Sequence, residues 1–202
     1  IGGSYSSVLR MQELGGEFVE IAGLIFKREW FEMVDVVPIV ADRIRYWDRA
    51  YLPGDGCYTA GVLLARAQDG IFYVEDVQRG QWGPMERNQI IRQTAEADAR
   101  RYHGSVRIYI EHEGSGASKE SLQNIIRELP EFPVYGDTAA LSASYKIAGG
   151  VKLPGDAKIR RALPLAAHAE AKEVRVKKAS WMPDFLDELA QFPESKHCDQ
   201  VD

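Results

Sequence analysis

The chain has few cysteines and no long hydrophobic segment. Cys57 and Cys198 are the only cysteines among 202 residues, so at most one disulfide could form, and a reducing compartment is the expected setting. No apolar run approaches the ~20 residues that a membrane-spanning helix needs, and no signal peptide is visible at the start. Internal repeats and low-complexity tracts are absent as well. The length suits one globular domain, with or without an arm.

Negative charge dominates the chain, but it is unevenly distributed. The net charge is −5, yet the segment from Leu141 to Trp181 holds nine basic residues against three acidic ones. This segment therefore carries +6 and the remainder −11. A basic patch in an acidic chain suits a polyanion that is contacted on one face. The alternative is a solvated, lysine-rich surface.

Hydrophobic periodicity predicts five strands and four helices. Strands are expected at residues 43–50, 58–65, 71–77, 105–111 and 132–135, where apolar residues alternate or run together between turn signals. Helices are expected at residues 84–102, after Gly116, at 159–171, and around Phe185 to Leu189. Residues 174–176 are too few to assign firmly.

The order of these elements predicts an α/β fold. Three consecutive strands form an antiparallel meander, whereas strands that are separated by a helix tend to be parallel. The expected result is a mixed five-stranded sheet with helices on both faces. In one such arrangement the first strand lies beside the fourth and parallel to it. Residues 1–42, with glycine breakers and no clear period, are expected to be a linker or arm, and residues 43–202 the folded domain.

Acidic residues stand at the ends of several of these segments. Asp48 and Glu111 each follow an apolar run, and parallel neighbours would bring their carboxylates to one edge of the sheet. Carboxylate oxygens are the ligands that Mg²⁺ and Mn²⁺ prefer. Glu113 competes with Glu111, because both would lie on the same strand face. The alternative for Asp48 is a turn residue or an ion pair with Arg45.

The last six residues carry a second acidic group. Asp199 and Asp202 would share one face of a helix, so that one could bind a metal and the other support it. An exposed acidic helix start is the alternative. His197 is expected to cap or position rather than bind, and Asp55, in a glycine-flanked turn, is a candidate for an outer metal contact.

Several short motifs, taken in order, resemble the nuclease domain of tailed-phage large terminase subunits, which has a ribonuclease H-like fold. No single motif decides the resemblance, but their joint order is specific. The matching stretches are Phe26-Lys27-Arg28-Glu29-Trp30, Tyr46-Trp47-Asp48-Arg49-Ala50, Tyr58-Thr59-Ala60-Gly61-Val62, Ile110-Glu111 with Gly114-Ser115-Gly116, Arg161-Ala162-Leu163-Pro164, Phe185-Leu186-Asp187-Glu188-Leu189 with Phe192-Pro193, and His197-Cys198-Asp199-Gln200-Val201-Asp202.

The resemblance implies a metal-dependent endonuclease that cuts concatemeric double-stranded DNA with two Mg²⁺ or Mn²⁺ ions. It implies Asp48, Glu111 and Asp199 as the catalytic metal ligands, and it favours Glu111 over Glu113. Asp202, His197 and Asp55 would support them. The closing motif of the family usually has an aspartate where this chain has Cys198, and a thiol is a poor ligand for hard ions.

The resemblance also implies partners. Such nucleases are joined to a packaging ATPase, but no Gly-x-x-x-x-Gly-Lys-Ser/Thr motif occurs here, so residues 1–42 would be the remnant of the connection. The portal, the small terminase subunit and the host bacterial cytoplasm are implied as the setting. Lys158, Arg160 and Arg161 are the candidates for contacting DNA phosphates, although Arg161 could instead be structural. Another enzyme of the same fold, such as a Holliday-junction resolvase or a transposase, and a non-catalytic DNA-binding or docking module are the rival hypotheses.

Overall fold

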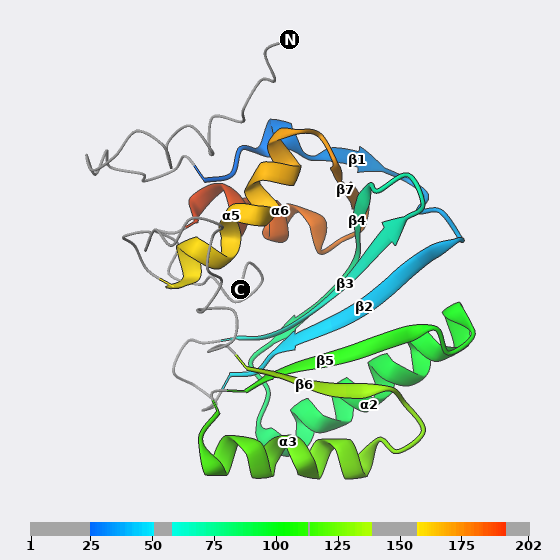
Figure 1. Ribbon diagram of the computed structural model, residues 1–202, viewed down its shortest axis with the longest axis vertical. Helices are drawn as coiled ribbons and strands as arrows, with labels where there is room; N and C mark the ends of the chain where they lie inside the picture. Colours follow the sequence, from blue (N-terminus) through cyan, green and yellow to red (C-terminus); the bar gives the residue numbers. More distant parts are fainter. Residues whose placement is uncertain (1–24, 51–57, 113, 139–156, 193–202) are drawn as a thin grey trace, which may run out of the picture.

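A seven-stranded mixed sheet forms the centre of the computed structural model, which describes residues 25–50, 58–112, 114–138 and 157–192. The strand order is β1-β7-β4-β3-β2-β5-β6 (Figure 1). In chain order the elements are η1 (Arg28–Trp30), β1 (Glu32–Val34), β2 (Ala41–Asp48), β3 (Thr59–Ala67), β4 (Phe72–Gly80), α2 (Pro84–Tyr102), β5 (Val106–His112), α3 (Gly116–Glu128), β6 (Val134–Thr138), α5 (Ala157–Glu170), β7 (Val174–Lys177) and α6 (Met182–Gln191).

The pairing of β2 confirms the arrangement that the sequence predicts. β2 pairs antiparallel with β3 and parallel with β5, and β3 pairs antiparallel with β4. The β2–β5 register places Trp47 opposite Ile110. The first predicted strand therefore lies beside the fourth, and their carboxyl ends lie at the same edge of the sheet.

Helices cover both faces of the sheet, as predicted (Figure 1). On one face, α2 and α3 pack on β2 and β5 through a cluster that includes Trp47, Ile108, Ile110, Ile91 and Ile125. On the other face, α5 and α6 pack on β4 and β7 through a second, larger cluster. Because alternate residues of a strand face opposite sides, β2 contributes Trp47 to the first face and its neighbours to the second.

The sheet has seven strands rather than the predicted five. The added strands, β1 and β7, pair with each other in parallel, and β7 also pairs with β4. β1 has three residues and β7 has four, which is too short for a periodic pattern to be visible in the sequence. Tertiary pairing with β4 decides that these residues are strands.

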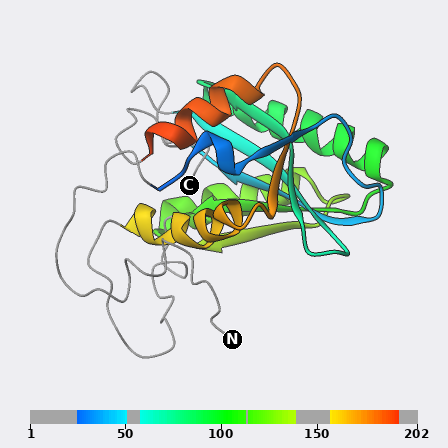
Figure 2. The same cartoon turned by 90° about the horizontal axis from the view of Figure 1, so that it is seen from above.

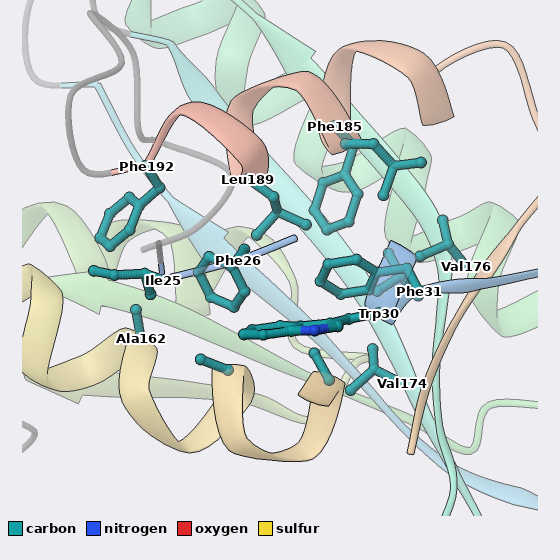
Figure 3. Packing of buried hydrophobic residues seen from close by; sticks show 14 of the residues in the cluster. Ile25, Phe26, Trp30, Phe31, Ala162, Val174, Val176, Phe185, Leu189 and Phe192 are labelled. Carbon is teal, nitrogen blue, oxygen red and sulfur yellow. The ribbon is translucent and has the colours of Figure 1, made fainter. Parts of the chain in front are cut away.

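Several of residues 25–42 are buried in the folded unit, although residues 1–42 are predicted to be a linker or arm. Phe26, Trp30 and Phe31 are buried at 2%, 7% and 6% exposure in the larger core cluster. Figure 3 shows their rings between α5 and α6, and Figure 2 shows the same segment passing between these helices. Burial of three aromatic rings contributes several kcal/mol, so this segment stabilises the domain. The expected connection to an ATPase concerns residues outside the described part and stays a prediction.

Buried charges in the first half of β2 are paired. Arg45, at 1% exposure, makes a two-pronged contact with Asp98 of α2 at 2.9 and 3.0 Å, and its Nη2 lies 2.9 Å from Asp76 Oδ2. Arg43 Nε donates to Glu75 Oε2 at 2.9 Å. Since each guanidinium meets a carboxylate, the sheet can hold both charges away from water. Arg45 thus pairs with carboxylates other than that of Asp48.

Close packing explains one glycine of β3. Gly61 lies opposite Trp47 in the β2–β3 register, and a Cβ at this position would be 2.5 Å from the indole ring. The ring is fully buried, so it cannot move aside. None of the described helices is long and apolar enough to cross a membrane.

Candidate active site

The carboxyl ends of β2 and β5 bring two of the predicted metal ligands together. Asp48 and Glu111 directly follow the paired residues Trp47 and Ile110. Trp47 and Ile110 face α2 and α3, so Asp48 and Glu111 face the opposite side, where α5 lies. Both carboxylates are half-buried. Two strands that are remote in sequence thus present adjacent acidic groups on one face, as predicted.

Arg161 lies against this acidic pair. Its Nη1 is 3.1 Å from Glu111 Oε1, and the two side chains are 17% and 13% exposed. Arg161 comes from the first turns of α5, so this helix delivers a positive charge to the carboxylates. The predicted DNA contact Arg161 is therefore held beside a predicted metal ligand. Lys158 and Arg160 lie on the same helix, but their side chains are outside the described part of the structure.

Asp137 is a third carboxylate on this face, and the sequence reading missed it. It lies on β6 opposite Glu111 in the β5–β6 register, and its Oδ2 accepts a hydrogen bond from the Tyr46 hydroxyl at 3.1 Å. Alternation of side chains along a strand could have identified it. The predicted strand ends at Tyr135, and an extension by two residues places Asp137 on the same face as Tyr135.

The pKa of Tyr46 reflects its burial and the negative charge of this surface. Burial raises the pKa of its hydroxyl well above the ordinary value, and the carboxylates of Glu111 and Asp137 raise it further, while Arg161 opposes them. The hydroxyl therefore stays protonated and acts as a hydrogen-bond donor to Asp137. This donor fixes the position of one carboxylate next to another.

The remaining predicted site residues lie outside the described part of the chain. These are Glu113, Asp55, His197, Asp199 and Asp202. Within the described residues, no group of three or more His, Cys, Asp or Glu side chains converges closely enough to hold a metal ion. The donors that the structure does place here, the carboxylates of Asp48 and Glu111, are hard oxygen ligands, which fit Mg²⁺ or Mn²⁺ and not a soft metal.

A pair of arginines borders the site on the other face of the sheet. Arg49 donates from Nη1 to Ser121 Oγ at 3.0 Å and from Nη2 to the Glu111 carbonyl at 3.4 Å. Arg87, in the first turn of α2, donates from Nη1 to the Ala50 carbonyl at 3.0 Å. Burial and, to a lesser extent, the nearby Arg87 lower the pKa of Arg49 to about 10, whereas Asp48 acts in the opposite direction. The sequence reading assigned no role to either.

Comparison with known families agrees with this architecture. A family model described as the terminase RNaseH-like domain matches residues 45–202, which is more than three quarters of the chain. The matched range holds β2 from Arg45 onward, β5 and α5, and therefore every described residue of the acidic face. Neither a curated protein nor a solved structure shows a significant match. The family is that of a nuclease-type module of a terminase. The mixed sheet, the helices on both faces and the family match together show that the chain belongs to the terminase RNaseH-like domain family.

Proposed function

We propose that the chain is a metal-dependent endonuclease module that cuts concatemeric double-stranded DNA during genome packaging. One observation carries the proposal: Asp48 and Glu111 lie on one face of the sheet at the carboxyl ends of two adjacent parallel strands. Ligand sites of open α/β sheets favour this edge. Family membership raises the expectation of nuclease chemistry, and the carboxylates supply the donors for it.

Asp48 and Glu111 would hold Mg²⁺ or Mn²⁺, with Asp199 as a further ligand and with Asp202, His197 and Asp55 in support. A pair of such ions, when bound, supplies a hydroxide nucleophile at neutral pH and stabilises the charge that develops on the leaving 3′ oxygen. The chain therefore needs no histidine base. The two half-buried carboxylates repel each other. The positive charge of Arg161, which pairs with Glu111, offsets part of this repulsion.

Arg161, with Lys158 and Arg160, would contact the DNA backbone. Arg161 already lies at 3.1 Å from Glu111, so a phosphate that approaches the carboxylates would meet this guanidinium first. Arg–phosphate contacts are independent of sequence and sensitive to salt. Tyr46 and Asp137 would position the acidic face without touching the reacting atoms.

Double-stranded DNA would be the substrate, and an ATPase domain, the portal and the small terminase subunit the partners in the host bacterial cytoplasm. These partners rest on the family alone. The described helices give no indication of a membrane-spanning segment.

The decisive test is the substitution Asp48→Asn, assayed by plasmid cleavage in Mg²⁺ and Mn²⁺. We expect cleavage to fall at least about a thousandfold, because several kcal/mol of transition-state stabilisation depend on the bound ions. Asp42→Asn is the matched control, since Asp42 is exposed and lies on the same strand at its other end. It should cut like the wild type. Undiminished cleavage by a folded Asp48→Asn variant would overturn the proposal.

Two rival functions predict other outcomes of the same assay. Preferential cutting of branched DNA, or strand transfer, would indicate a resolvase or a transposase on this fold. DNA binding without any metal-dependent cleavage would indicate a non-catalytic module.

A further inference from the structure

Arg49 and Arg87 present a concentration of positive charge that the nuclease chemistry above does not use. Both side chains are largely withdrawn from water, with Arg87 at 8% exposure. Neither forms an ion pair with a carboxylate within the described part of the chain; the partners of their Nη1 and Nη2 atoms are neutral oxygens, Ser121 Oγ and two backbone carbonyls. Their Nε atoms are buried without a hydrogen-bond partner among the described residues.

Such an arrangement is costly unless an anion completes it. A buried guanidinium is normally paired with a carboxylate, as Arg43 and Arg45 are in the same strand. Arg87 donates to the carbonyl of Ala50, the residue that follows Arg49, so the two guanidiniums are neighbours and repel each other. The first turn of α2 lies here too, because Arg87 is the fourth residue of that helix, and helix N-termini carry partial positive charge. The surroundings thus favour an anion.

We propose that Arg49 and Arg87 form a binding site for a phosphate group, supplied by the backbone of the DNA substrate away from the bond that is cut. The site rests on the proposed function for the identity of its substrate. Arg49 follows Asp48 directly but points to the opposite face of the sheet, so one strand end would hold the reacting phosphate on one side and a second phosphate on the other. The planar fork of arginine suits two oxygens of one phosphate.

The position of Arg49 would let this site orient the DNA relative to the acidic pair. Its hydrogen bonds join the end of β2 to the end of β5 and to α3. A phosphate that binds Arg49 would therefore be held at a fixed position relative to both strands that carry the acidic pair. Binding energy gained there would fix the DNA with respect to Asp48 and Glu111. We assign Arg49 the direct contact and Arg87, which is more buried and anchored to Ala50, the supporting charge.

The test measures DNA binding without metal, so that it is independent of cleavage. Anisotropy of a labelled duplex in EDTA, over a series of NaCl concentrations, would compare the wild-type chain with Arg49→Gln, Arg49→Lys and Arg127→Gln. We expect Arg49→Gln to weaken binding roughly tenfold and to lower the salt slope by about one. Arg49→Lys should keep the slope but not the full affinity. Arg127, exposed at the far end of α3, is the control and should change neither quantity.

A second measurement separates DNA from free phosphate and from a structural role. Inorganic phosphate, compared with chloride at equal ionic strength, should raise the melting temperature of the wild type more than that of Arg49→Gln. If that difference appears while DNA binding is unchanged, the site takes free phosphate and the DNA assignment is overturned. If Arg49→Gln alters neither DNA binding nor the response to phosphate, or only lowers the melting temperature, no anion site exists. These measurements need no metal. They can therefore be interpreted whether or not the Asp48→Asn variant loses cleavage.

Discussion

The first half of β2 and its carboxyl end differ in how their charged side chains are paired. In the first half, Arg43 and Arg45 are buried and each meets a carboxylate of a neighbouring element at 2.9 Å. At the carboxyl end, like charges gather: Asp48 lies beside Glu111 on one face, and Arg49 lies near Arg87 on the other. The same strand therefore has ion pairs at one end and, at the other, like charges side by side, although Glu111 also pairs with Arg161.

This difference separates residues that serve the fold from those that serve a ligand. A buried ion pair satisfies both of its members, and removal of one member leaves the other uncompensated. Like charges that lie side by side repel each other, and the partners found here, Arg161 for Glu111 and neutral oxygens for Arg49, offset this only in part, so an outside ion of opposite sign would stabilise each group. Divalent cations would do so on the acidic face and phosphates on the arginine face. The predictions below test this division through stability, from the largest expected effect to the smallest.

Substitution of a paired charge should destabilise the domain most. Arg45→Met leaves the carboxylate of Asp98, at 6% exposure, buried without its main partner. We expect the free energy of unfolding to fall by about 3–5 kcal/mol in urea titrations followed by circular dichroism. The double variant Arg45→Met/Asp98→Leu should recover part of this loss. A loss below about 1 kcal/mol would show that the pair is not what holds this half of β2.

Packing near the carboxyl end of β2 should matter somewhat less. Gly61→Ala places a methyl group against the buried ring of Trp47, and overpacking of this kind costs about 1–3 kcal/mol. Thermal melting would measure it. Gly116→Ala is the control, because no atom lies within 4 Å of a Cβ at that helical position. Equal melting temperatures for the two variants would contradict the packing described here.

Removal of a segregated charge should leave stability nearly unchanged while it removes activity. Glu111→Gln loses the ion pair with Arg161 but also relieves repulsion with Asp48, so we expect a change of about 1 kcal/mol or less. Plasmid cleavage should fall about a thousandfold, as for loss of a metal ligand. A large loss of stability without loss of cleavage would place Glu111 with the structural pairs.

The smallest effect on stability is expected at Asp137. Asp137→Asn keeps an oxygen that can accept the hydrogen bond of the Tyr46 hydroxyl, so the free energy of unfolding should stay within about 0.5 kcal/mol. Cleavage should fall about 10- to 100-fold if this carboxylate positions the acidic face. Titration with Mn²⁺, followed by calorimetry, would show whether the loss follows weaker metal binding. If Asp137→Asn cleaves DNA and binds Mn²⁺ like the wild type, the role of Asp137 is limited to its hydrogen bond with Tyr46.

The sequence predicted the central part of the fold well and its edges poorly. β2 and β5 were placed side by side because a meander followed by a helical crossover leaves few other arrangements, and both strands have clear patterns. β1 and β7 were missed as a pair, because three or four residues carry no period. Ile25 to Phe31 looked peripheral for the same reason, although the segment packs in the larger core cluster.

The site divides in the same way. The placement of Asp48 and Glu111 at one edge of the sheet could be predicted, since each closes an apolar run, whereas their role as metal ligands stays a prediction. Asp137 was not placed at the site, because the predicted strand ends two residues before it. Arg49 and Arg87 are separated by two strands, and only their hydrogen bonds to Ser121 and Ala50 bring them to one edge.

By itself the sequence determined the order and type of the main elements and the two acidic strand ends, because periodicity and turns are local properties of the chain. The tertiary structure alone decided which charges are paired and which are gathered. Arg43, Arg45 and Arg49 look alike in the sequence, yet the first two pair with carboxylates and the third donates to a hydroxyl and a backbone carbonyl. The partner of a buried charge is set by the residues that the fold brings opposite it, and those residues lie on strands and helices remote in the chain.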